Sequence, residues 1–101
     1  MNEAVTGGGA FAVAGDRWLF SGALTLDDAM AVLEHAAELP LPASGIVDMA
    51  ELVHADSAAL AVLLELKRRA AAEGKRLSFA TFPPMLESLA RVYGIEDLFT
   101  Q

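Results

Sequence analysis

The polar side chains that could take part in catalysis or binding lie in one short stretch, which contains Asp48, His54, Asp56 and Ser57. Asp56 and Ser57 both carry side-chain oxygens that accept hydrogen bonds from the free N–H groups at a helix start. Residues 58–64 are uncharged, which predicts a helix that starts at Ser57. Ser57 could act only as the cap of this helix, or its hydroxyl could also be accessible to a partner at the positive end of the helix. The two roles do not exclude each other. Such an end favours a bound phosphate and can also receive another protein.

Catalysis and metal binding have little support in the same residues. Asp48 and Asp56 could form a pair of carboxylates for acid–base chemistry, but nothing else in the sequence indicates a substrate cleft. His35 and His54 are isolated in the sequence. Because the chain has no cysteine, these two histidines alone do not indicate a metal site. The glycines at 7–9 do not form a phosphate loop, because no Gly-Lys-Ser/Thr follows them. We therefore expect no catalytic residue, no metal and no cofactor.

The first half of the predicted helix carries small apolar residues on an arc that becomes charged from Glu65 onward. An apolar patch on the solvent side of a helix indicates a docking surface, unless a neighbouring loop covers it. His54, expected in a loop before the helix, either contacts the partner or is only solvated. The residues predicted to bind a partner protein are His54, Asp56, Ser57, Ala58, Ala61 and Val62.

Alternating strand and helix patterns surround this stretch. We expect strands at 10–14, 17–21, 45–49 and 77–81, and helices at 25–39, at 57–74 and from 83 to the break at 94. Thr25 and Asp28 have capping-box spacing at the first helix. Helices between strands predict right-handed crossovers on a mixed sheet, hence a single α/β domain.

The first two helices are predicted to bury one apolar face each. In the first helix the residues expected to face the core are Leu26, Ala29, Met30, Val32, Leu33, Ala36 and Ala37. In the second helix they are Leu60, Leu63, Leu64, Leu66 and Ala70. Val62 is predicted to lie outside this buried arc. In the third helix Leu86, Leu89, Ala90 and Tyr93 share one side.

Composition limits the classes of function. The chain has 101 residues, 54% of them hydrophobic, which suits one folded domain over 10–101 after a glycine-rich flexible tail over 1–9. Its net charge of −7 argues against binding to nucleic acid and against adsorption to an anionic membrane. No apolar run approaches the ~20 residues that span a bilayer. We expect a cytoplasmic protein with no signal peptide and no direct membrane insertion.

The stretch from Asp48 to Leu60 resembles the signature of the STAS domain, in which a strand ending in Asp leads to an Asp-Ser or Asp-Thr pair that opens a helix. The segments 14–24 and 89–95 are most similar to the small STAS subunit of the Mla ABC transporter, which moves phospholipid between the two membranes of Gram-negative bacteria. One difference is Ala59, which stands where the family usually has glycine.

This resemblance implies a mixed sheet of four to five strands, with helices packed mainly on one face. It also implies a non-enzymatic accessory subunit that binds the ABC transporter ATPase subunit, with Ser57 at the contact. The alternative is an anti-sigma-factor antagonist of a partner-switching pathway. In that pathway Ser57 is the candidate phosphorylation site, and the partner is an anti-sigma factor that is also a serine kinase.

Overall fold

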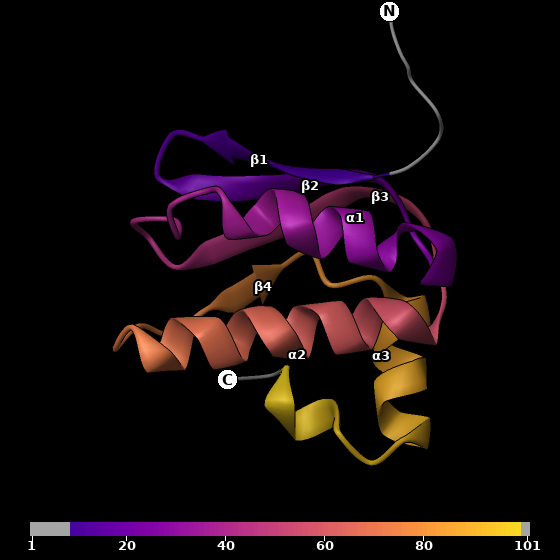
Figure 1. The fold of residues 1–101 in the computed structure, drawn as a ribbon. Coiled ribbons are helices and arrows are strands. Elements are labelled where there is room, and N and C mark those ends of the chain that lie inside the picture. The colour runs from indigo at the N-terminus through magenta and orange to yellow at the C-terminus, as the bar shows by residue number, and fades with distance from the viewer. Residues whose placement is uncertain (1–8, 100–101) are drawn as a thin grey trace, which may run out of the picture.

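A mixed four-stranded sheet with strand order β1-β2-β3-β4 carries the fold (Figure 1). The structure is a computed structural model that describes residues 9–99. Within these residues the elements are β1 (Ala10–Ala14), β2 (Arg17–Leu24), α1 (Leu26–Ala37), β3 (Ile46–Ala55), α2 (Ser57–Ala72), β4 (Ser78–Ala80), α3 (Pro84–Val92) and the 3-10 helix η1 (Glu96–Leu98). The predicted order of strands and helices is confirmed. Residues 1–8 of the expected tail lie outside the described residues, and Gly9 lies against the ring of Phe20.

The connections explain how the strands pair. Gly15, with φ of 67°, allows the tight turn that makes β1 and β2 antiparallel. The helices α1 and α2 connect strands that pair in parallel, β2 with β3 and β3 with β4. Both crossovers advance in the same direction along the sheet, so right-handed connections place both helices on one face. The expected arrangement, with the helices mainly on one face, is confirmed.

An aromatic cluster forms the core beneath α1. Trp18 and Phe20 alternate along β2 and are fully buried, and Phe11 of β1 packs on both of them. Its ring centroid lies 5.4 Å from that of Trp18 and 4.8 Å from that of Phe20. The indole Nε1 of Trp18 donates to the carbonyl oxygen of Pro40 at 3.0 Å, which ties the segment after α1 to the sheet.

The third strand is longer than predicted. It continues to Ala55 because β2 also continues to Leu24, and the two strands stay paired through two register shifts. The loop expected between Met49 and Asp56 is therefore wrong, and His54 lies in β3 opposite Ala23. Since β3 ends one residue before Asp56, the strand leads almost directly into α2.

The expected burial of α1 is only partly correct. Val32 and Ala36 are buried, but Leu26 and Met30 are 75% and 71% exposed, and Ala37 is exposed too. The apolar arc of α1 is wider than the area that the sheet and α2 cover, so its outer part remains open. Other expected core residues are also accessible: Tyr93 is exposed, and Leu64 is half-buried.

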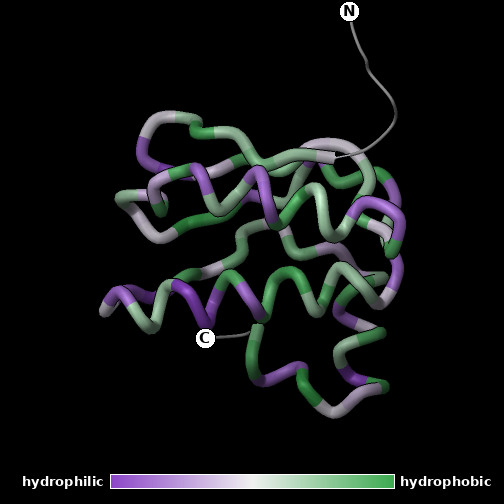
Figure 2. Tube along the Cα trace, in the orientation of Figure 1, coloured by the Kyte–Doolittle hydropathy of each residue, from purple (hydrophilic) through white to green (hydrophobic). Residues whose placement is uncertain are grey.

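The polarity of α2 changes along its length (Figure 2). The N-terminal half of α2 is hydrophobic, whereas its C-terminal half carries Lys67, Arg68 and Arg69. None of the helices within residues 9–99 is long and apolar enough to cross a membrane.

Candidate functional site

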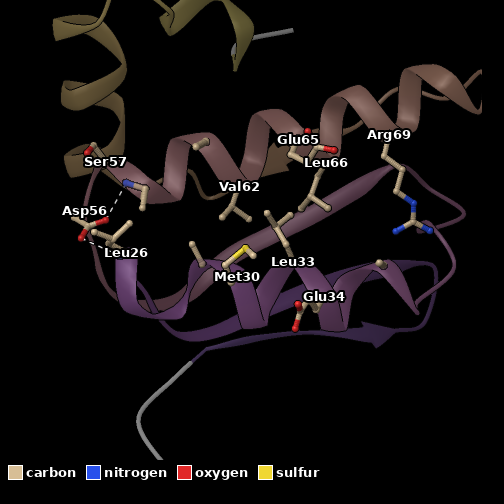
Figure 3. Close-up of a pocket in the computed structure, with 14 residues that line it drawn as sticks. Leu26, Met30, Leu33, Glu34, Asp56, Ser57, Val62, Glu65, Leu66 and Arg69 are labelled. Atoms are coloured by element: carbon tan, nitrogen blue, oxygen red, sulfur yellow. Dashed lines mark hydrogen bonds between the residues drawn. The ribbon is translucent and has the colours of Figure 1, made fainter.

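One carboxylate, that of Asp56, joins the N-termini of α1 and α2 (Figure 3). Its Oδ1 accepts from the backbone N–H of Ala58 at 2.9 Å, and its Oδ2 accepts from the backbone N–H of Leu26 at 3.1 Å. The start of α1 has its own second acceptor, because the Asp28 carboxylate accepts from the backbone N–H and the hydroxyl of Thr25. The two helix starts are thus fixed side by side.

The cap of α2 is Asp56, and the expectation that Ser57 could serve as this cap is wrong. Ser57 is the first residue of the helix and is exposed. Both residue types are good caps, and the extended backbone of Asp56, with φ of −132°, gives it the cap position. Ser57 is consequently free of the capping role, and its hydroxyl faces solvent at the positive end of α2.

Asp56→Ala is expected to destabilise the domain, because it removes the acceptor of one N–H group from each of two helices. A lost helix cap costs about 0.5–2 kcal/mol, so we expect the free energy of unfolding to fall by roughly 1–3 kcal/mol in a urea titration. Asp56→Asn, which keeps one acceptor oxygen, should lie between Asp56→Ala and wild type. The matched control is Ser57→Ala, which should change stability by less than about 0.5 kcal/mol. Equal losses for both alanine variants would show that Ser57 caps the helix after all.

A groove of about 1010 Å³ runs between α1 and α2 from this shared start (Figure 3). Its walls are two helices whose backbone groups are hydrogen-bonded internally, so side chains line it. On the α1 side the lining residues are Leu26, Ala29, Met30, Leu33, Glu34 and Ala37. On the α2 side they are Asp56, Ser57, Ala58, Ala61, Val62, Glu65, Leu66 and Arg69.

The groove has a buried floor and an open apolar rim. Val62 is 1% exposed and forms part of the floor, where its side chain points toward Met30 and Leu33 of α1 (Figure 3). The prediction that Val62 lies outside the buried arc is therefore wrong, because α1 covers this side of α2. Ala58 and Ala61 are accessible, as expected for a docking surface.

The far end of the groove is fixed by Arg69. Its guanidinium donates to the carbonyl oxygens of Ala36 at 3.0 Å and Leu39 at 2.7 Å, at the C-terminus of α1. A cation is favourable there, because the last carbonyls of a helix carry partial negative charge. Asp56 at one end and Arg69 at the other hold α1 and α2 at a fixed spacing, so the groove is preformed.

Acidic side chains accompany the apolar rim. Glu34 and Glu65 both line the groove. Arg68 forms an ion pair with Glu65, and its Nε donates to the Oε1 of Glu65 at 3.0 Å. The hydrogen bond from Arg68, together with the positive charge of Arg68, lowers the pKa of Glu65. Glu65 therefore stays ionised at neutral pH.

The structure does not bring the other candidate residues into the groove. His54 is exposed on β3 and does not line it. The Oδ2 of Asp48 lies 3.8 Å from the Nη1 of Arg17, and the Oδ1 of Asp48 accepts from the backbone N–H of Ala50. An extended strand separates Asp48 from Asp56 by roughly 25 Å, so these carboxylates do not form a catalytic pair. Among residues 9–99 no group of three or more acidic or histidine side chains could hold a metal ion.

Sequence patterns alone did not identify the α1 side of the groove. Leu26, Met30 and Glu34 belong to it, whereas the helical pattern predicts Leu26 and Met30 in the core. The signal that could have found them is the width of the apolar arc on α1. The apolar arc of α1 includes Leu26, Met30, Val32 and Ala36, and it is wider than one neighbouring surface can cover. This width indicates that part of the arc stays exposed.

Comparison with known proteins gives a family match. The family model described as "Mlab, STAS domain" matches residues 19–100. Among solved structures, one described as "Crystal Structure Analysis of Mglu" is similar, with 22% identity and a TM-score of 0.51. That similarity covers 73% of this chain but only 19% of the other chain, and at this identity it supports the fold alone. No curated protein matches the chain.

Proposed function

The chain belongs to the STAS domain family, in its MlaB-like group, and from this membership we propose that it binds the ATPase of an Mla-type phospholipid-transport ABC complex. STAS domains are generally non-catalytic domains that mediate protein–protein interactions. In this proposal the chain is a non-enzymatic regulatory subunit. It lies in the cytoplasm and reaches the inner membrane only through its partner.

The observation that carries the proposal is the preformed groove with Ser57 at its open end. Exposed apolar side chains such as those of Leu26 and Met30 indicate a surface that another molecule covers. Around Ser57 the small side chains of Ala58 and Ala61 allow a partner to approach the helix closely. Ser57 contacts the partner directly in this proposal, whereas Asp56 and Val62 shape the surface from beneath.

The alternative partner is an anti-sigma factor that phosphorylates Ser57. It is favoured by one specific observation, which is the exposure of the Ser57 hydroxyl at the first position of α2. A phosphate there would benefit from the partial positive charge at the helix start. It would also stand beside the Asp56 carboxylate, whose negative charge repels it.

Affinity purification from the native cell tests the proposal. The full chain with a tag should recover an ABC ATPase together with its permease, and a bait made of the tag alone should recover neither. Recovery of a histidine-kinase-like ATPase without a permease would instead establish the anti-sigma alternative. Phosphate on Ser57 in that material, measured by mass spectrometry, would strengthen the second outcome.

A further inference from the structure

We propose that the element which fills the groove between α1 and α2 is an amphipathic helix of the partner, with basic residues beside its apolar stripe. This inference rests on the proposed function, since it describes the part of the ATPase that the same groove would hold. It concerns the middle of the groove rather than the Ser57 end.

The apolar residues of α1 that line the groove form a row along the helix, which suits a helical partner. Leu26, Met30, Leu33 and Ala37 line the groove at intervals of four, three and four residues. This is the spacing with which one helix packs along another. On α2 the lining residues Ala58, Val62, Glu65 and Arg69 repeat the same intervals. A third helix in the groove would therefore meet the apolar row of α1 and the accessible Ala58 and Ala61 of α2, above the buried Val62.

An extended peptide fits this groove poorly. Peptides that bind as strands gain affinity from main-chain hydrogen bonds to an exposed sheet edge. Here both walls are helices, so their central N–H and C=O groups are already paired within each helix. The groove offers apolar side chains instead, which is how a groove receives the apolar face of a helix.

Charge decides which kind of helix fits. On a helical wheel Asp27, Glu34 and Glu38 form a line beside the apolar row of α1, and all three are exposed. The nearby cations are occupied, because Arg68 pairs with Glu65 and Arg69 donates to the C-terminus of α1. Lysine or arginine residues on the flank of the bound helix would therefore meet an uncompensated acidic line. The net charge of −7 would also attract such a segment over longer range.

The test uses the purified full chain and three synthetic peptides of one length. The first has leucine at intervals of three and four residues with lysine on both flanks, the second has the same residues in scrambled order, and the third replaces lysine with glutamate. We expect saturable binding of the first peptide alone, measured by fluorescence anisotropy. Met30→Glu should weaken that binding at least tenfold. The matched control is Val53→Glu, which adds the same charge at a 79% exposed residue outside the groove and should leave binding unchanged.

Each other outcome overturns the inference. Equal binding of the scrambled peptide would mean that charge alone attracts it, and equal binding of the glutamate peptide would remove the role of the acidic line. Failure of all three peptides would exclude a helical occupant. A dimer in light scattering that Met30→Glu dissociates would assign the groove to a second copy of the chain. The proposed function fails separately, if the purified ATPase does not bind the wild-type chain.

Discussion

Val62→Glu is expected to destabilise the domain by roughly 3–5 kcal/mol. Val62 is 1% exposed between α1 and α2, so a glutamate there would bury a carboxylate among apolar side chains. An uncompensated buried charge costs roughly 3–5 kcal/mol. Because small domains are stable by only about 5–15 kcal/mol in total, this loss removes a large share of the stability of the domain. Circular dichroism at 25 °C and a urea titration will measure the effect.

The matched control for this change is Ala61→Glu, one residue earlier in the same helix. Ala61 is exposed, so its glutamate keeps its hydration and should leave the free energy of unfolding within about 0.5 kcal/mol of wild type. If Val62→Glu melts at the wild-type temperature, the packing of α1 on α2 described above is incorrect. If both variants unfold, the surface position of Ala61 is incorrect instead.

Much of the fold follows from local sequence rules. The alternation of strand and helix patterns predicts the observed order of elements, and the Thr25–Asp28 spacing predicts the contact that starts α1. Gly15 and Gly74 mark the end of β1 and of α2, respectively, and both have positive φ. These features depend on neighbours in sequence, which is why sequence reasoning finds them.

The features that sequence reasoning missed depend on neighbours in space. A helical wheel orders the residues of α2 around its axis, but it does not show that α1 covers Val62. It also groups Met30 with Ala36, although the sheet and α2 cover only Ala36. The choice of cap between Asp56 and Ser57 depends on where β3 ends, and that end is set by pairing with β2. Sequence reasoning thus indicated the start of α2 as a candidate site, but it did not predict the groove that α1 and α2 form there.

Ser57→Glu is expected to weaken binding to the ATPase at least tenfold, an increase in binding free energy of about 1.4 kcal/mol or more. The added side chain brings bulk and a negative charge to an exposed position beside Asp56, within a contact surface of small residues. Desolvating that charge at the interface opposes binding. Ser57→Ala keeps the local shape, so we expect it to change the dissociation constant by less than about threefold. Both variants should stay folded, because Asp56 provides the cap and a negative charge is favourable at a helix start.

The most direct test of the account is a calorimetric titration of the purified ATPase with the full chain and with these two variants. A thermal melt of each variant alone comes first, so that loss of binding cannot arise from unfolding. The account predicts saturable binding of wild type, nearly equal binding of Ser57→Ala, and much weaker binding of Ser57→Glu. Wild-type affinity for Ser57→Glu would contradict it, since Ser57 would then lie outside the interface. No binding of the wild-type chain would remove the ATPase as its partner.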